Sequence, residues 1–184
     1  MCGITGFFPG PNGYQNLEHK KYLLKMSEAL VHRGPNDSGA WFDEETGIGL
    51  AHQRLSIIDT SAAGHQPMDS SSGNFRVIFN GEVYNHIEIR KEIESIANVN
   101  WKSTSDTETI LEAFEVWGIE NSIKKFVGMF AIAVWAYKER SLYLIRDRLG
   151  EKPLYYGWQN DVFLFGSELK SLYAHPSFEN KLSR

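Results

Sequence analysis

Residues 129–136 read Met129-Phe130-Ala131-Ile132-Ala133-Val134-Trp135-Ala136, an apolar run that no polar side chain interrupts. Because side chains alternate between the two faces of a strand, this run predicts a strand that is covered on both faces. Shorter runs with strand character flank it on both sides along the chain. The further strands are predicted at 39–42, 48–52, 76–84, 141–146, 153–158 and 162–165.

Helical periodicity occurs in segments between some of these strands, but the helices and strands do not alternate strictly along the chain. The helices are predicted at 16–31, 87–96, 107–117 and 168–174. His32-Arg33-Gly34-Pro35 fits the end of the first helix, since basic residues, a glycine and a proline are typical of helix C-termini. Strands and helices that come in blocks favour an α+β fold of mainly antiparallel sheets over a doubly wound α/β fold.

Composition narrows the function classes. The chain has 184 residues, of which 42 % are apolar and 13 % aromatic, and its formal net charge is −4. This is the composition of a globular protein, and its mild acidity favours no nucleic-acid partner. No apolar run reaches the ~20 residues of a membrane span, and the N-terminus has no signal-peptide pattern. We expect one domain over residues 1–184, a cytoplasmic location and no membrane partner.

Cys2 is the only cysteine, and it directly follows Met1. A single cysteine excludes an intrachain disulfide and a Cys-x-x-Cys pair, and the six histidines lack metal-ligand spacing, so no metal site is predicted. If Met1 is removed, one residue carries both a thiol and an α-amine, and the amine can act as general base for the thiol. The alternative is that Cys2 is an incidental small residue at the end of the chain.

Further motifs follow Cys2 in a fixed order. They are Cys2-Gly-Ile-Thr-Gly, His32-Arg-Gly-Pro, His52-Gln-Arg-Leu-Ser-Ile-Ile-Asp59, Asn80-Gly-Glu-Val-Tyr-Asn85, Ser105-Asp-Thr-Glu108, Gly128-Met-Phe-Ala-Ile-Ala, Arg146-Asp-Arg-Leu-Gly-Glu-Lys-Pro-Leu-Tyr-Tyr156 and Ser167-Glu-Leu-Lys170. In this order and spacing the chain resembles the class II (N-terminal-nucleophile) glutamine amidotransferase domain. Within that class it is most similar to the N-terminal glutaminase domain of glutamine-hydrolysing asparagine synthetases. The resemblance implies a four-layer αββα sandwich.

The resemblance also implies a mechanism. Cys2 would attack the side-chain amide of L-glutamine and form a thioester, and glutamate and ammonia would be released. The Asn80 side-chain amide and the Gly81 backbone N–H would form the oxyanion hole, which needs two donors aimed at the developing negative charge. A second interpretation of Asn80-Gly81 is a two-residue type I′ hairpin turn, for which this dipeptide is the strongest sequence signal.

Substrate-binding residues are implied in the same way. Arg54 would bind the α-carboxylate of glutamine through its planar fork, although a surface or ion-paired arginine is the alternative. The main chain from Leu55 to Ile57 would line the same pocket. Asp106 and Glu82 would bind the α-ammonium group. Residues 105–108 also fit a capping box, with Ser105 as N-cap and Glu108 at N3, and both roles can hold together.

Two features limit the resemblance. Asn36 stands where the family has an aspartate, and the Ser-Gly-Gly-x-Asp-Ser loop of the family's ATP-dependent synthetase domain is absent. We therefore expect no cofactor in this domain, with ATP and Mg²⁺ confined to a synthetase domain or subunit that amidates aspartate or a related carboxylate. Two alternatives stay open: a glutaminase domain of another amidotransferase, and a catalytically silent glutamine-binding or subunit-interaction module. A homodimer stays open as well.

Overall fold

The computed structural model describes residues 1–10, 18–56 and 59–180, and these form two antiparallel sheets with helices. Contacts divide the chain into two compact units. The first consists of Met1–Leu55 and the chain from Pro153 onward, and the second consists of Ser56–Lys152. The two crossings of the chain are therefore at residues 55–56 and 152–153. Each unit has its own sheet and its own apolar core, and each is described by itself.

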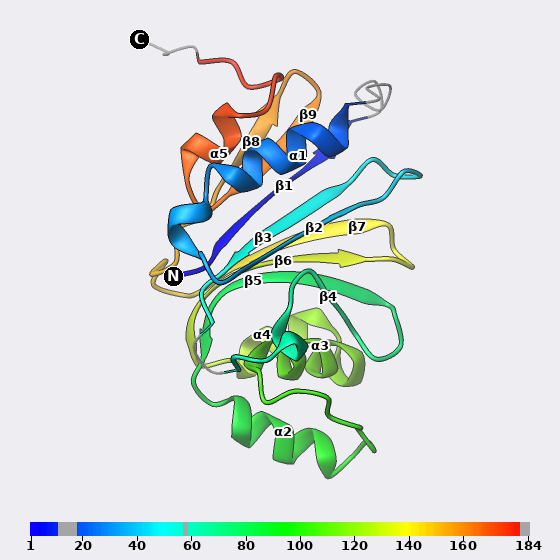
Figure 1. Ribbon diagram of the computed structural model, residues 1–184. Helices are drawn as coiled ribbons and strands as arrows, with labels where there is room; N and C mark the ends of the chain where they lie inside the picture. The colour runs from blue at the N-terminus through cyan, green and yellow to red at the C-terminus, as the bar shows by residue number, and fades with distance from the viewer. Residues whose placement is uncertain (11–17, 57–58, 181–184) are drawn as a thin grey trace. The chain divides into compact units, whose positions relative to one another are not determined.

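The first unit contains a five-stranded sheet in the order β2-β3-β1-β9-β8, in which all neighbours are antiparallel. Helices α1 and α5 lie side by side on one face of this sheet (Figure 1). The strands are β1 (Gly3–Pro9), β2 (Asp37–Phe42), β3 (Gly49–Arg54), β8 (Tyr155–Gln159) and β9 (Val162–Gly166), and the helices are α1 (His19–Glu28), the 3₁₀ turn η2 (Val31–Arg33) and α5 (Leu169–Tyr173).

An apolar core between α1, α5 and this sheet holds the first unit together. Phe7 of β1, Leu23 and Met26 of α1 and Leu164 of β9 are all buried there. Leu23 and Met26 are three residues apart and so lie on one face of the helix, which explains why α1 packs this way. Strand β1 is the central strand of this sheet. Cys2 directly precedes the first residue of β1, Gly3, and so lies at one end of the sheet that α1 covers.

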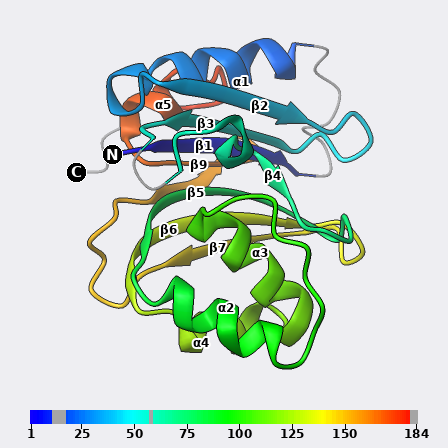
Figure 2. The same cartoon turned by 60° about the horizontal axis from the view of Figure 1, so that its bottom comes forward.

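The second unit contains a four-stranded antiparallel sheet in the order β4-β5-β6-β7. Helices α2, α3 and α4 are grouped on one face of it (Figure 2). The strands are β4 (Met68–Asp69), β5 (Phe75–Val83), β6 (Gly128–Ala136) and β7 (Ser141–Arg146), and the helices are the 3₁₀ turn η3 (Ala62–Gly64), α2 (His86–Glu94), α3 (Asp106–Trp117) and α4 (Ile119–Lys125).

Strand β6 is buried along both faces. Every residue of 130–136 is buried, which confirms the prediction of a strand without an exposed face. Phe130 and Ile132 pack with Phe79 of β5 and Phe114 of α3 in the helix-facing core. The predicted α+β class with mainly antiparallel sheets is therefore confirmed.

The first and shortest elements differ from the prediction. Residues 3–9 form β1, although they were not predicted as a strand, and β4 and α4 were also missed. Helix α1 ends at Glu28, and η2 then separates it from Gly34, so the prediction that His32–Pro35 ends this helix is wrong. Among the described helices, none combines the length and the apolarity that crossing a membrane requires.

Candidate functional site

The Cys2 side chain is anchored to the main chain of Leu55. Strands β1 and β3 pair Gly3 with Gln53, so Cys2 lies beside the residues that follow Gln53. The Leu55 N–H donates to Cys2 Sγ at 3.3 Å, and the Sγ–H faces the Leu55 carbonyl oxygen at 3.6 Å. The thiol is half-buried and free of any disulfide. A lone thiol directly behind Met1 is thus held in one place.

Arg33 holds the main chain of the same cysteine. Its Nε donates to the Cys2 carbonyl oxygen at 2.8 Å, and its Nη1 lies 2.8 Å from Glu168 Oε1. Partial burial raises the pKa of Glu168, but hydrogen bonds from Arg33, His32 and Lys170 outweigh it and lower that pKa to about 2. Sequence reasoning gave Arg33 only a helix-ending role. The His32–Pro35 motif was the available signal, but a contact across 31 residues cannot be derived from it.

Glycines allow this packing. A Cβ at Gly3 would lie 2.9 Å from Leu30 Cβ, and one at Gly34 would overlap the Gln53 carbonyl group. Gly34 therefore lets η2 approach the end of β3, and Gly3 lets β1 pass close beneath the chain that follows α1.

Arg54 lies at the same end of this sheet as Cys2. It is the last residue of β3, is paired in register with Asp37, and is only 7 % exposed. The structure thus brings together Cys2, Arg54 and Leu55 from the predicted site. Ile57, the remaining residue predicted on this loop, lies outside the described residues.

Asn80 and Gly81 lie inside β5 rather than at a turn. Their Cα partners on β6 are Ala131 and Phe130, and pairing continues without a break from residue 75 to residue 83. The type I′ hairpin interpretation is therefore wrong. Glycine is needed at position 81 for packing, since a Cβ there would lie 2.6 Å from Phe130 Cα and closer still to the Met129 carbonyl oxygen.

One edge of β5 carries a short series of N–H groups that have no strand partner beyond the end of β4. Strand β4 pairs with β5 only at residues 76 and 77. Farther along this edge, the Phe79 N–H donates to Gln66 Oε1 at 2.7 Å, and the Val83 N–H donates to Asp106 Oδ2 at 3.0 Å. Because N–H directions alternate along a strand, the Gly81 N–H points to this same edge, between the two side-chain acceptors.

The Asn80 side chain is buried with an unused donor. It is 1 % exposed, and its Nδ2 has no hydrogen-bond partner among the described residues. An unsatisfied buried donor costs about 1–3 kcal/mol, so such a group in a native protein calls for an explanation. A ligand oxygen that reaches Nδ2 would supply the missing acceptor.

Asp106 is the first residue of α3, and Ser105 caps that helix by accepting the Glu108 N–H at 3.3 Å. Burial raises the pKa of Asp106 to about 6, and repulsion from Glu82 acts in the same direction, while main-chain N–H groups partly oppose both effects. The two carboxylates thus lie close enough to interact. The predicted capping box is only half formed, because Glu108 accepts N–H groups from Lys102 and Ser103 rather than from Ser105.

The sequence profile of the family described as the glutamine amidotransferase domain matches residues 1–184. The chain belongs to this family. The chain is therefore an enzyme domain. The predicted N-terminal-nucleophile amidotransferase membership is therefore confirmed.

Curated relatives of this amidotransferase domain are similar over nearly its whole length. The chain is 37 % identical over 186 residues to an asparagine synthetase (glutamine-hydrolyzing) 3 of Bacillus subtilis, covering 100 % of this chain and 29 % of the relative. It is 40 % identical over 172 residues to asparagine synthetase (glutamine-hydrolyzing) 1 of the same organism, covering 94 % and 26 %. The chain therefore spans less than a third of the length of these relatives.

A solved structure shares the fold. It is a glutamine phosphoribosylpyrophosphate amidotransferase from B. subtilis complexed with ADP and GMP, with a TM-score of 0.73 and 19 % identity. The similarity covers 94 % of this amidotransferase domain and 43 % of that chain.

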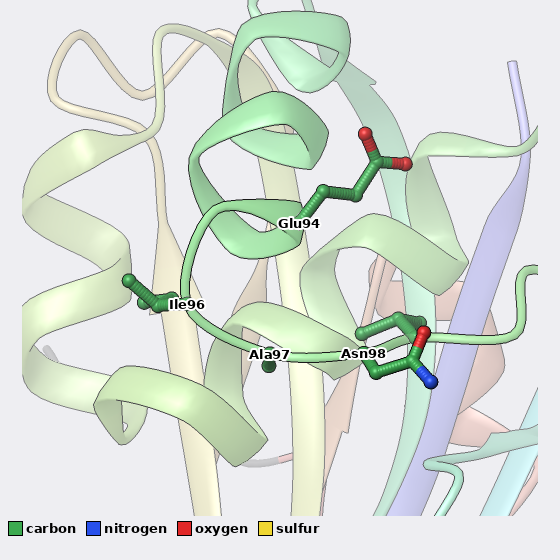
Figure 3. A pocket seen from close by; sticks show the side chains of 5 residues that line it. Glu94, Ile96, Ala97 and Asn98 are labelled. Atoms are coloured by element: carbon green, nitrogen blue, oxygen red, sulfur yellow. The ribbon is translucent and has the colours of Figure 1, made fainter.

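The predicted site residues of this amidotransferase domain fall into two groups. Cys2, Arg54 and Leu55 belong to the first unit, and Asn80, Gly81, Glu82 and Asp106 belong to the second. Within the described residues, no three His, Cys, Asp or Glu side chains are grouped so that they could hold a metal ion. A hollow at the end of α2, lined by 94 and 96–99, contains none of the site residues (Figure 3).

Proposed function

We propose that this amidotransferase domain hydrolyses L-glutamine to glutamate and ammonia, with Cys2 as the nucleophile. The observation that carries the proposal is the anchoring of the Cys2 thiol by Leu55 and of the Cys2 carbonyl by Arg33. An incidental residue at a chain end has no need of contacts to two separate segments. A nucleophile does, because a misplaced attacking atom loses much of the rate that orientation provides.

The reaction uses the cysteine's own amine. Removal of Met1 frees the α-amine of Cys2, which takes the proton of the thiol. The thiolate attacks the amide carbon of glutamine, and the resulting oxyanion accepts hydrogen bonds from Asn80 Nδ2 and the Gly81 N–H. The protonated amine returns its proton to the leaving nitrogen, which departs as ammonia. Water, deprotonated by the same amine, then hydrolyses the thioester and releases glutamate.

Charged groups select a free amino acid. Arg54 binds the α-carboxylate through its bidentate guanidinium, and the main chain from Leu55 to Ile57 lines the pocket. Glu82 and Asp106 bind the α-ammonium group. A glutamine within a peptide carries neither terminal charge at its α-carbon and is therefore excluded.

The ammonia passes to an ATP-dependent synthetase domain or subunit that amidates aspartate or a related carboxylate. Support comes from the two B. subtilis relatives, which are named asparagine synthetases and are more than three times as long as the matched segment. ATP and Mg²⁺ act in that portion, and residues 1–184 act without a cofactor, in the cytoplasm. The higher identity to asparagine synthetases favours this acceptor over that of a phosphoribosylpyrophosphate amidotransferase.

The test compares three forms of the chain: one with Met1 removed, as confirmed by N-terminal mass spectrometry, one with Met1 retained, and the Met1-free Cys2→Ala variant. We expect ammonia release from glutamine only by the first form, because the other two lack the free amine or the thiol. A glutamine-like electrophile should alkylate Cys2 in the first form alone. Hydrolysis by Cys2→Ala at the parent rate would contradict the mechanism, and glutamine binding without hydrolysis by the Met1-free form would support a silent binding module.

A further inference from the structure

Gln66 forms a buried bridge that neither the sequence motifs nor the proposed mechanism includes. It lies between η3 and β4 and is 5 % exposed. Its Oε1 accepts the Phe79 N–H at 2.7 Å, and its Nε2 donates to Thr107 Oγ1 at 3.0 Å. Phe79 and Thr107 are themselves 3 % exposed, so the whole bridge is shielded from water.

The chemistry of the amide fixes the direction of this bridge. Only the oxygen of a glutamine amide can accept an N–H, so Oε1 must face Phe79 and Nε2 must face the Thr107 hydroxyl. Both ends are satisfied, and neither can be exchanged with the other. Gln66 therefore sets one separation between two segments rather than adapting to several.

The two bridged residues are neighbours of proposed substrate-binding groups. Phe79 precedes Asn80 on β5, and Thr107 follows Asp106 on α3. A second link joins the same elements, from the Val83 N–H to Asp106 Oδ2 at 3.0 Å. The Gly81 N–H points to the edge between these two links. The N-terminus of α3 is thus tied to β5 on both sides of the proposed oxyanion donor.

The rest of α3 is fixed independently. Glu112 accepts the Ser71 N–H at 3.1 Å and the Ser71 hydroxyl at 2.9 Å. Asn74 donates to Glu115 at 2.8 Å. These contacts attach the middle and the end of the helix to the loop before β5, so the Gln66 bridge is not needed to hold α3 on the sheet. Unlike these contacts, the Gln66 bridge lies at the end of α3 that carries Asp106.

We propose that Gln66 is a positioning residue that fixes the separation between the oxyanion donors, Asn80 and Gly81, and the ammonium-binding carboxylate of Asp106. In glutamine, two methylene groups separate the α-carbon from the amide carbon, so a site that grips both ends must hold its own groups at a matching separation. Gln66 thereby lets binding of the ammonium group align the amide for attack. This inference rests on the proposed glutaminase function.

The experiment compares L-glutamine with 4-carbamoylbutanoate, which has the same terminal amide but lacks the α-ammonium group. The measured quantity is the ratio of kcat/KM for the two substrates, with the full chain after Met1 removal. A ratio is unaffected by loss of folded protein, so a purely structural role would leave it unchanged. The variants are Gln66→Met, which keeps the length without hydrogen bonds, Thr107→Val, which keeps the shape without the hydroxyl, and Thr107→Ser, which keeps the hydroxyl.

We expect the ratio to fall about tenfold in Gln66→Met and Thr107→Val, since the ammonium group and the amide can no longer be held in register at once. Thr107→Ser should keep the ratio of the unsubstituted chain. The control is Ser122→Ala, which removes buried hydrogen bonds of 2.8 Å and 2.7 Å to the Ala113 and Gly118 carbonyls at the other end of α3. This control should lose stability but keep the ratio.

Two results would overturn the inference. One is an unchanged ratio in both Gln66→Met and Thr107→Val while the unsubstituted chain hydrolyses glutamine, which would leave the proposed function intact. The other is an equal fall in the ratio in Ser122→Ala. If the Met1-free chain hydrolyses neither substrate, the proposed function fails and the inference fails with it. Thr107→Val alone decides the question if Gln66→Met does not fold.

Discussion

At the scale of single residues, Asn80 combines complete burial with an unused donor. For Asn80→Ala we expect kcat for glutamine to fall roughly 100- to 1,000-fold, the usual effect of removing one oxyanion donor. We expect the free energy of unfolding to change by less than about 1 kcal/mol, since the deleted Nδ2 group has no hydrogen-bond partner among the described residues. Steady-state ammonia release and denaturant unfolding measure the two quantities.

The matched control is Asn85→Ala. Asn85 Nδ2 donates to the Lys125 carbonyl at 3.0 Å, and its Oδ1 accepts the Val127 N–H at 2.9 Å. We expect this variant to lose about 1 kcal/mol of stability and to keep its kcat. A loss of stability in Asn80→Ala that is larger than in Asn85→Ala, together with an unchanged kcat, would assign Asn80 to structure.

Asp106 gives a prediction about pH. Since its pKa is raised to about 6, it is ionised at neutral pH and becomes neutral as the pH falls through that value. We expect kcat/KM for glutamine to fall about tenfold per pH unit below 6, because the attraction for the ammonium group is lost. In Asp106→Asn the KM should be high throughout, and this step in the pH profile should be missing. The measurement is kcat/KM for glutamine at pH values from about 5 to about 8.

The substrate 4-carbamoylbutanoate serves as the control for this profile. This substrate has no ammonium group. Its kcat/KM with the unsubstituted chain should therefore show no fall below pH 6, just as kcat/KM for glutamine should show none in Asp106→Asn. An identical step for both substrates would place the titrating group elsewhere. The free energy of unfolding should instead rise as the pH falls below 6. Burial of the ionised Asp106 carboxylate costs free energy, and protonation relieves that cost.

At the scale of elements, the pairing of β5 with β6 depends on Gly81. A Cβ at this position would overlap main-chain atoms of Met129 and Phe130, which cannot move without opening the sheet. We expect Gly81→Ala to lower the free energy of unfolding by about 2–4 kcal/mol, as for other strongly overpacked positions. Gly157→Ala on β8 is the control, since a Cβ there meets nothing within 4 Å and should be tolerated. Equal unfolding midpoints for the two variants would contradict this account.

Periodicity predicted the long elements because local pattern and packing agree in them. Strand β7 matches its predicted bounds, and α3 begins one residue earlier than predicted, at Asp106. Strand β1 was missed because Gly3, Gly6 and Pro9 weaken a strand pattern. The structure shows that a Cβ at Gly6 would overlap Gly49 and Phe165, so this glycine is required by packing. Helix α4 was missed because it follows Gly118 directly, whose φ of +75° marks a break.

The site could be predicted only as far as its motifs are local. The motifs gave Cys2, Asn80 and Asp106 as candidates, and their roles stay predictions. Arg33 and Gln66 could not be found this way, because each acts through hydrogen bonds to segments distant in the sequence. Arg33 reaches Cys2, and Gln66 reaches Thr107 across 41 residues. These long-range hydrogen bonds depend on strand order and register. The hydrophobic periodicity and the local motifs of the sequence predict neither strand order nor register.

At the scale of the whole molecule, we expect the chain to act alone in the first half-reaction. The Met1-free chain should hydrolyse glutamine after treatment with a metal chelator and without nucleotide, at an unchanged rate. The physical reason is that the attacking group, its base and the oxyanion donors all come from side chains and main chain. Ammonia assays with and without chelator, Mg²⁺ and ATP measure this. A rate that is restored only by metal or nucleotide would contradict it.

The central place of β1 in its sheet has a consequence for synthesis. Within the described residues, β1 is synthesised before both of its neighbours, and β9 is made more than 100 residues after β3. At about 5–20 residues per second, on the order of ten seconds separate the two during translation. Through that interval only β3 can pair with β1, and the start of the chain is open on its other side. The Met1–Cys2 peptide bond is therefore accessible to a processing enzyme well before the sheet around it is complete.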